Sequence, residues 1–338
     1  MRLLARLHAR GMVHSDPHLD NFLTVAHRLH AVDGDGVRKL GAARSQRSSI
    51  RNLGLLLAQL PPVADGRIES LIHSYLEERG WTATSRLLVQ CRRVLAEQRS
   101  DRYRRYLRKC QRDCSEFEVE RRAGRYQVSV RAGSGRIPAG FFAEPDSLVQ
   151  SGRMLKNGNS ATVVRCEVPD ATRSDRLVVK RYNSKGFWHA LRRSIEPFPR
   201  FRRAWCYGQL LHLLGVPTAR PLALCERGPG VFRPRGWLLL EDLGDTHLGE
   251  EVAAAGISDA RVDEVVGIFS ALRAAGLRHG DTKVTNFLIH DGHVHLIDLD
   301  AMTLSARGVE RDIERFLDNW EGQTRERFLK AFQAAGLL

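Results

Sequence analysis

The chain contains the same polar loop twice. HSDPHLDNFL occupies residues 14–23 and HGDTKVTNFL occupies residues 279–288. In both copies an aspartate follows the asparagine after 12 residues, which gives the pairs Asn21 and Asp33, and Asn286 and Asp298. The preceding segments LHARGMVH and LRAAGLRH also align. Because the match extends through the flanks of the loop, we interpret it as an internal repeat around which each half of the chain must fold.

The repeated residues are those that phosphoryl transfer from a metal–nucleotide complex requires. One carboxylate accepts the proton of the attacking hydroxyl, while an amide oxygen and a second carboxylate hold magnesium against the phosphates. These roles would fall to Asp281, Asn286 and Asp298 in the second copy and to Asp16, Asn21 and Asp33 in the first. A single copy would also fit an Asx-rich loop that caps itself. Two copies with matching flanks favour the kinase-like interpretation.

Length and composition indicate a globular chain of two domains. It has 338 residues, 43% of them hydrophobic, and one core rarely grows past ~250–300 residues. No apolar run approaches the ~20 residues of a membrane span, and the opening MRLLARLHARGMVH is too charged for a secretory signal, so we expect a cytoplasmic protein. The six cysteines are scattered, which favours free thiols over a zinc site.

The formal net charge of +14 indicates a polyanionic partner. The densest basic stretches, at residues 99–113, 121–125 and 192–203, are dominated by arginine, whose side chain grips phosphate oxygens in pairs. A phosphorylated glycolipid, an anionic membrane face and nucleic acid all fit this charge. The alternative is that each stretch is the solvated face of a helix.

Residues 1–114 are typical of the C-terminal lobe of a kinase. The pattern predicts the end of an amphipathic helix over residues 1–13, then the loop with a short strand pair, and further helices at 51–62, 65–81 and 84–110. A nucleotide-binding lobe needs something like a hundred residues before such a loop. We therefore expect that this copy lost its N-terminal lobe or that Met1 lies inside a longer gene.

The second copy is preceded by segments that fit such a lobe, and we place the domain boundary near residue 115. Residues 154–168 predict two strands around a turn with Gly158, Asn159 and Ser160, and residues 175–183 predict a strand that presents Lys180. In a kinase fold the first hairpin covers the phosphates and a strand lysine neutralises them. We therefore predict that these four residues bind the nucleotide.

The remaining segments predict the rest of a kinase domain. Residues 201–224 read as a helix turning into a strand, 257–277 as the helix before the second loop, 293–302 as the strand ending in Asp298, and 310–320 as a helix with Asp312 aimed at the loop. Residues 235–244 predict a strand and hinge in which Glu241 to Leu243 offer backbone groups to adenine. The predicted fold is α+β, a bilobal protein-kinase-like domain at ~116–338 (N-lobe ~115–244, C-lobe ~245–338), complete but compact, after a mostly helical remnant at 1–114.

From Leu155 to Trp320, about half of the chain, the pattern resembles the lipopolysaccharide core kinases of the Kdo/WaaP group, within the protein-kinase-like superfamily. The resemblance rests on KNGNSATVV, LVVKRYN, LLGVPTARPLAL, LLLEDL, HGDTKVTNFL and IDLD in that order. It implies phosphorylation of a heptose or Kdo hydroxyl in the lipopolysaccharide inner core, dependent on ATP and Mg²⁺, at the cytoplasmic face of the inner membrane. The enzyme would be peripheral on that anionic surface, and nucleic acid is then not the expected partner.

The resemblance also implies a role for each matching residue. Asp281 would be the base, Asn286 and Asp298 the metal ligands and Lys180 the phosphate lysine, with Lys283 near the transferred phosphate. Two departures stand out. Ala204 lies near where the following helix usually carries a glutamate that holds the lysine, and Leu299 and Asp300 replace the end of a DFG motif. We therefore expect a less fixed lysine and slow catalysis.

The first copy departs in another way, because His18 replaces the lysine of the second copy. HSDPHLDN is similar to the catalytic loop of aminoglycoside and choline phosphotransferases. Its three chemical residues survive without a lobe to bring ATP, so we expect a vestigial second site, and a vestigial or docking role for residues 1–114.

Two alternatives remain. Lys283 also fits a protein Ser/Thr kinase, although the short C-terminal tail leaves little room for peptide-docking helices. A pseudokinase scaffold that binds anionic glycolipid fits the missing helix glutamate and the truncated first copy.

Overall fold

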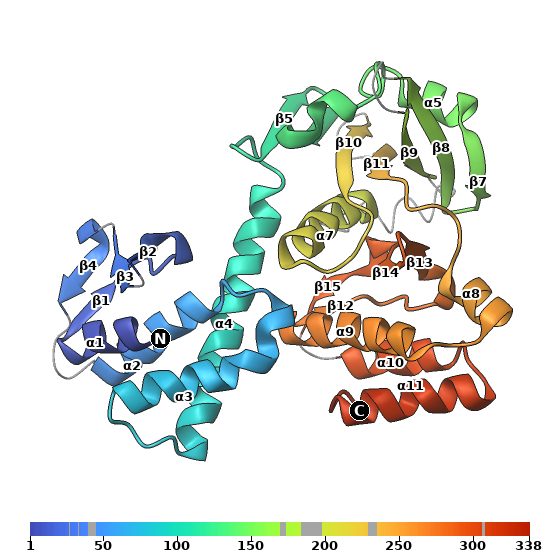
Figure 1. Ribbon diagram of the computed structural model, residues 1–338. Helices are drawn as coiled ribbons and strands as arrows, with labels where there is room; N and C mark the ends of the chain where they lie inside the picture. Colours follow the sequence, from blue (N-terminus) through green and yellow to red (C-terminus); the bar gives the residue numbers. More distant parts are fainter. Residues whose placement is uncertain are drawn as a thin grey trace. The chain divides into compact units, whose positions relative to one another are not determined.

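The computed structural model describes residues 1–26, 28–32, 34–39, 45–169, 174–183, 198–228, 235–305 and 308–338 (Figure 1). Asp33, the third expected residue of the first copy, lies outside these residues. The chain forms two compact units, one of residues 1–104 and 270–276 and one of residues 105–269 and 277–338. Helices and sheets occur in both, so the fold class is α+β, as predicted.

The first unit packs helices around the first copy of the loop. The helices are α1 (Arg2–Ala9), α2 (Ser45–Leu57), α3 (Ile68–Glu78) and α4 (Ser85–Lys109), whose last residues belong to the second unit. Two antiparallel strand pairs flank the loop: β1 (Met12–His14) with β4 (Val37–Lys39), and β2 (Phe22–Val25) with β3 (Arg28–Ala31). Apolar residues at helical spacing, such as Ile68, Ile72 and Leu76 on α3, are buried between the helices.

The second unit begins with an antiparallel sheet of seven described strands. In chain order they are β5 (Phe117–Arg122), β6 (Arg125–Val130), β7 (Arg153–Asn157), β8 (Ala161–Pro169), β9 (Ser174–Tyr182), β10 (Pro221–Arg227) and β11 (Arg235–Glu241). Their order in the sheet is β5-β6-β10-β11-β9-β8-β7. Lys180 therefore lies on an inner strand, opposite Val163 on β8 and Leu238 on β11. The predicted strands at 154–168, 175–183 and 235–244 are present.

Two helices pack on this sheet. Helix α5 (Pro145–Ser151) contacts β8 and β9, and α7 (Arg200–Leu214) contacts β10 and β11 (Figure 1). Helix α7 comes unusually close to β10, because a Cβ at Gly208 would lie 2.4 Å from Cγ of Pro221. Glycine at this position lets α7 lie close to β10 and to Leu299, which follows Asp298.

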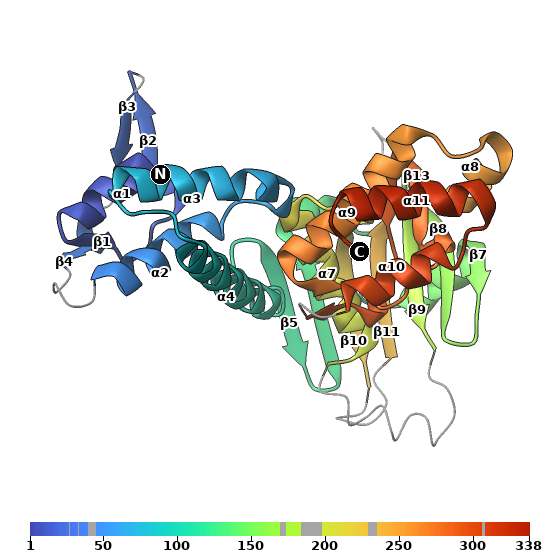
Figure 2. The same ribbon diagram turned by 90° about the horizontal axis from the view of Figure 1, so that it is seen from below.

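The rest of the second unit is mainly helical. It contains α8 (Leu248–Ala255), α9 (Asp259–Ala275, whose last residues belong to the first unit), α10 (Val309–Leu317) and α11 (Gly322–Ala334). The strand pairs are β12 (Leu277–Arg278) with β15 (Thr303–Leu304), and β13 (Phe287–His290) with β14 (His293–Leu296). Buried phenylalanines join the helices to the loop: Phe269, Phe287, Phe316, Phe328 and Phe332. Figure 2 shows α10 and α11 side by side.

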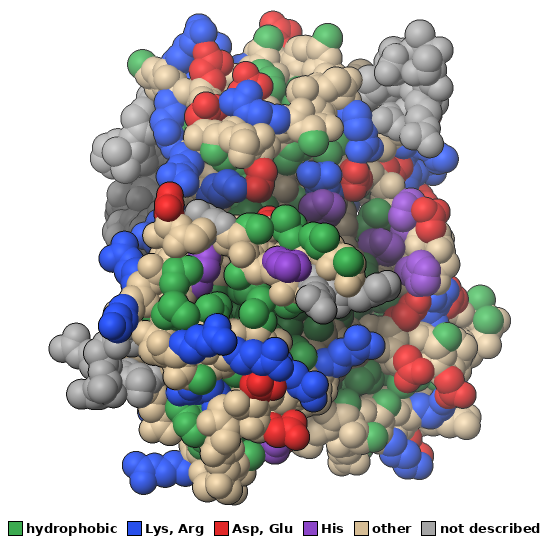
Figure 3. Space-filling model, turned by 60° about the vertical axis from the view of Figure 1, so that its left-hand side comes forward, with side chains coloured by type: hydrophobic (Ala, Val, Ile, Leu, Met, Phe, Trp, Pro, Cys, Tyr) green, Lys and Arg blue, Asp and Glu red, His purple; other side chains and the backbone are tan. Residues whose placement is uncertain are grey.

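Helices α8 and α11 were not among the predicted elements. The 18 residues that follow Trp320 were interpreted as a short tail, yet residues 322–334 form a helix that buries Phe328 and Phe332. Within the described residues, no helix combines the length and apolar character that a bilayer crossing requires. On the face drawn in Figure 3, Lys and Arg side chains lie in several groups with acidic side chains between them.

Candidate active site

A tight turn in the second unit presents Asp281. Its centre is Gly280, which has a φ of +83° and whose Cβ, if present, would lie 3.1 Å from the carbonyl oxygen of Ala301. Other residues rarely adopt this backbone conformation. The glycine therefore lets the turn that carries Asp281 lie against the segment that follows Asp298.

The buried ring of His279 joins these two segments. Its Nδ1 accepts a hydrogen bond from the backbone N–H of Asp281 (3.2 Å), and its Nε2 donates to the carbonyl oxygen of Ile297 (3.0 Å). Burial lowers the pKa of His279, which outweighs the neighbouring carboxylates. The ring is therefore neutral with its proton on Nε2, and it fixes the spacing between Asp281 and Asp298.

Asp312 on α10 binds the backbone of the turn, as the sequence indicated. Its carboxylate accepts the backbone N–H groups of His279 (2.7 Å) and Gly280 (3.1 Å), and its carbonyl oxygen accepts the hydroxyl of Thr282. Only 2% of its side chain is exposed. A buried carboxylate with several donors holds its surroundings rigidly, so Asp312 fixes the backbone that carries Asp281.

Two cations contact the Asp281 carboxylate. Lys283 Nζ lies 3.4 Å from Oδ2, and Arg315 Nη2 lies 2.6 Å from Oδ1 in an ion pair that is not aligned as a hydrogen bond. Arg315 was not predicted from the sequence. The sequence feature that could have identified it is its position three residues after Asp312, which places both on the same face of the helix. Both cations are about half exposed, and they orient the expected base without removing it from solvent.

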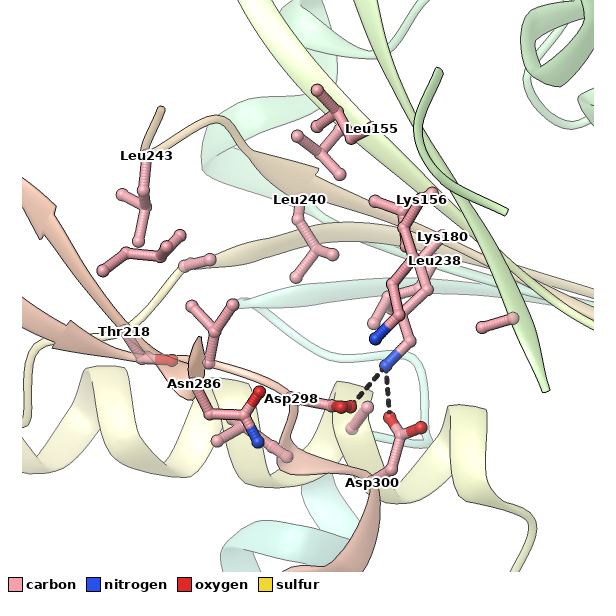
Figure 4. A pocket seen from close by; sticks show the side chains of 18 of the residues that line it. Leu155, Lys156, Lys180, Thr218, Leu238, Leu240, Leu243, Asn286, Asp298 and Asp300 are labelled. Atoms are coloured by element: carbon pink, nitrogen blue, oxygen red, sulfur yellow. Dashed lines mark hydrogen bonds and ion pairs between the residues drawn. The ribbon is translucent and has the colours of Figure 1, made fainter. Parts of the chain in front are cut away.

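The asparagine and the second aspartate lie beside this turn. Asn286 donates from Nδ2 to the carbonyl oxygen of Asp281 (2.8 Å), and its side chain lies beside Asp298 in Figure 4. Asp298 has the left-handed backbone angles φ 63° and ψ 55°, a conformation that costs an ordinary residue about 1 kcal/mol or more. Strain of this kind persists where the surrounding structure holds a side chain in one direction.

A pocket of about 450 Å³ opens between the seven-stranded sheet and this loop (Figure 4). Of the predicted site residues, those that line it are Ser160, Lys180, Glu241, Leu243, Asn286 and Asp298. Apolar side chains from the sheet, including Val178 and Leu240, form its roof. The pocket thus has an apolar half and a charged half, as a nucleotide base and its phosphates would require.

Other predicted residues lie outside the lining. Gly158 and Asn159 form the turn between β7 and β8, where Gly158 N–H donates to Ala161 (3.0 Å) and its carbonyl accepts Asn183 Nδ2 (3.0 Å). The side chain of Lys156 on β7 lines the pocket instead and was not predicted. At the hinge, the N–H of Glu241 donates to Arg220, so this group is used within the protein.

The expectation that Lys180 would be loosely held was wrong. Its Nζ lies 2.6 Å from Oδ1 of Asp298 and 2.9 Å from Oδ1 of Asp300 (Figure 4). Burial by itself lowers the pKa of Lys180, but the two carboxylates outweigh burial and raise it. Burial raises the pKa of Asp298, but the neighbouring basic groups, Lys180 foremost, together outweigh burial and lower this pKa below its ordinary value. Both groups are therefore charged at neutral pH.

The donor set suits magnesium that arrives with phosphates. No group of three or more His, Cys, Asp or Glu among the described residues could enclose a metal ion. Mg²⁺ typically takes one or two protein carboxylates and completes its shell with water and phosphate oxygens. The ionised Asp298 and the amide oxygen of Asn286 fit that pattern.

The first copy of the loop repeats this backbone in the first unit. Asn21 Nδ2 donates to the carbonyl of Asp16 (3.0 Å), as Asn286 does to Asp281. Leu19 N–H donates to Gln59, and Val284 N–H donates to Asn319, at the matching position. Asn52 corresponds to Asp312, because each lies seven residues before the residue just named, Gln59 or Asn319. Its role differs, since the amide of Asn52 donates to the carbonyl oxygen of His14.

The sequence model of the lipopolysaccharide kinase (Kdo/WaaP) family matches residues 149–331. Among solved structures, the chain is similar to one described as WaaP in complex with acyl carrier protein, with 21% identity, 56% of this chain and 83% of that chain covered, and a TM-score of 0.39. No curated protein matches the chain.

Proposed function

This chain belongs to the lipopolysaccharide kinase (Kdo/WaaP) family, whose members are phosphotransferases, and we propose that it transfers the γ-phosphate of ATP to a sugar hydroxyl of the lipopolysaccharide inner core. The observation that carries the proposal is the pocket in which Lys180, Asn286 and Asp298 meet under an apolar roof, next to the anchored turn of Asp281. Asp312 and His279 fix that turn, so its carboxylate is positioned before a substrate arrives.

Each residue has a defined task in this proposal. Asp281 orients the acceptor hydroxyl and takes its proton, and Lys283 stands beside it where charge develops on the transferred group. Lys180 binds phosphate oxygens, while Asn286 and Asp298 would hold Mg²⁺. When bound, that ion would neutralise charge on the phosphates. Leu243 and Glu241 border the part of the pocket suited to the adenine.

The proposed setting is the cytoplasmic face of the inner membrane, with the enzyme bound peripherally. The support is the +14 formal charge and the acceptor class of the family, since anionic glycolipid lies at such a surface. We further propose that residues 1–114 are a C-lobe-like remnant and residues 115–338 the kinase-like domain, because the first copy keeps the backbone contacts of the second.

The test uses the full chain, labelled ATP and Mg²⁺ with purified inner-core glycolipid or with a generic protein substrate. We expect labelled glycolipid with the wild type, none after chelation of the metal, and a loss of about 10²–10⁴-fold in Asp281→Asn. Nucleotide binding by that variant should be unchanged, because Asp281 lies outside the pocket lining. Labelling of protein alone would identify a protein kinase. Wild type and variant that are equally silent with both acceptors would identify a scaffold.

A further inference from the structure

Asp300 is a buried acid that the proposed reaction leaves without a task. Only 5% of its side chain is exposed. Besides Lys180, its Oδ1 accepts the hydroxyl of Tyr182 (2.8 Å), and its Oδ2 lies 2.7 Å from Nη2 of Arg200. A buried carboxylate is retained in a fold where its partners compensate the cost of its burial. Here the partners include the lysine that points into the nucleotide pocket.

Helix α7 carries basic residues where a kinase helix usually carries the glutamate that holds the lysine. Helix α7 has no acidic residue, and its first turns supply Arg200, Arg203 and Ala204 to this region. Arg203 donates to the carbonyl oxygen of Asp300 (3.1 Å), and Ala204 lines the pocket. The arginines of α7 therefore bind Asp300, and Asp300 in turn binds Lys180.

The two aspartates that contact Lys180 have different chemical positions. Both line the pocket, but Asp298 is 28% exposed and is the expected metal ligand, whereas Asp300 is 5% exposed and is also bound by Tyr182 and Arg200. A metal ion on Asp298 would compete with the Lys180 ammonium for the same carboxylate. The contact with Asp300 survives such a competition, because its other partners are protein groups.

We propose that Asp300 is the positioning residue for Lys180: it keeps the ammonium in the pocket while Lys180 exchanges Asp298 for the phosphate oxygens of a nucleotide. This deepens the proposed function and rests on it. The acid thus comes from the loop that carries the metal ligand and not from the helix that follows the strand. Without Asp300, Lys180 stays paired to Asp298, and both are less accessible to the nucleotide and its metal.

Binding of ADP, measured by calorimetry with and without Mg²⁺, tests this in the full chain. We expect Asp300→Asn to weaken ADP binding roughly tenfold or more even without metal, because a charge-assisted contact to the lysine is lost. The KM for ATP should rise in proportion while the KM for the acceptor is unchanged. The double variant Asp300→Asn with Ala204→Glu returns an acid to the pocket from the helix and should recover most of the affinity.

Two further variants separate positioning from folding. Glu226→Gln removes another largely buried acid, which pairs with Arg202 of α7 (2.6 Å) outside the pocket lining, and it should lower thermal stability but leave ADP affinity within about twofold. Tyr182→Phe removes one hydrogen bond to Asp300 without a change of charge, and should weaken ADP binding about threefold. If Asp300→Asn fails to fold, Tyr182→Phe decides.

The results that overturn the inference differ from those that overturn the function. If the wild type binds ADP and Asp300→Asn binds it equally well, Asp300 does not position the lysine. Asp300 is also not the positioning residue if Ala204→Glu restores no ADP affinity to Asp300→Asn and Tyr182→Phe binds ADP like the wild type. A wild type that binds no ADP removes the proposed function, and the inference with it.

Discussion

A single side chain, Asp312, determines whether the turn of Asp281 has one conformation. It is the acceptor for two successive backbone N–H groups, which are buried or partly buried. An N–H group that loses its acceptor in such a place costs about 1–3 kcal/mol. The first copy has Asn52 at the matching place, where the amide reaches a carbonyl oxygen and not these N–H groups.

We therefore expect Asp312→Ala to lower the free energy of unfolding by about 3 kcal/mol and transfer to the acceptor by more than tenfold. The exposed Glu310→Ala on the same helix is the matched control and should change stability by less than about 0.5 kcal/mol. Urea unfolding with initial rates measures both effects. Equal stability of the two variants would show that the turn is held by other contacts.

The pairing of Lys180 shows what residue-level prediction from the sequence misses. The loop residues Asp281, Asn286 and Asp298 could be predicted because their spacing is local and occurs twice. The partner of Lys180 could not, because Asp300 is 120 residues away and the kinase pattern places the acid on the helix that follows the strand. The sequence feature that could have indicated this pairing is Asp300 itself, an acid at the position of the glycine in a DFG motif.

At the scale of elements, one network joins α8, α9 and the hairpin of β13 and β14. Glu264 of α9 accepts hydrogen bonds from Arg261 (2.8 Å) and from the backbone N–H of Val294 (3.2 Å), and contacts Nδ1 of His293 (2.7 Å). Arg261 also reaches Glu251 of α8 (2.6 Å). Although burial raises the pKa of Glu264, these partners outweigh burial and lower it below 4.5.

A lowered pKa in the folded state means that this carboxylate stabilises the fold above its ordinary pKa, and that the contribution disappears as the pH falls through the folded value. We expect Glu264→Gln to lose about 1 kcal/mol near pH 6. The difference from the wild type should shrink and then vanish as the pH falls below 4.5 and through the lower pKa of the folded state. Thermal unfolding across this range measures it. If the stability difference between Glu264→Gln and the wild type did not change with pH, Glu264 would stabilise the fold by its packing and not by its charge.

Element prediction succeeded where the pattern is local and failed where tertiary contacts decide. Alternating residues marked β8 and β9, and apolar spacing marked α3, α4 and α9. Helix α11 was missed because it is rich in polar residues and its helical signal is confined to Phe328 and Phe332, four residues apart. It becomes a stable helix by packing on Phe316, which the sequence alone does not reveal.

At the scale of the whole molecule, the chain holds two copies of one loop and only one described pocket that suits a nucleotide. The first unit keeps the backbone contacts of Asp16 and Asn21. Its only lysine between residues 1 and 104 is Lys39, which pairs with Met12 across a two-stranded sheet and not above the loop. Among the described residues of the first unit, none is a lysine placed as Lys180 is in the second unit.

Variants at matching positions of the two copies test this asymmetry. Asp298→Ala should abolish magnesium-dependent nucleotide binding by the full chain, since the metal ligand of the second copy is lost and the described part of the first unit has no lysine placed like Lys180. Asp16→Asn should transfer phosphate like the wild type, whereas Asp281→Asn should not. Calorimetry with and without Mg²⁺ is the decisive measurement: we expect one nucleotide per wild-type chain, bound more tightly with Mg²⁺, and no gain from Mg²⁺ in Asp298→Ala. A nucleotide retained by Asp298→Ala and lost on further change of Asp16 would make the first unit a second working site, because no other described loop offers that set of residues.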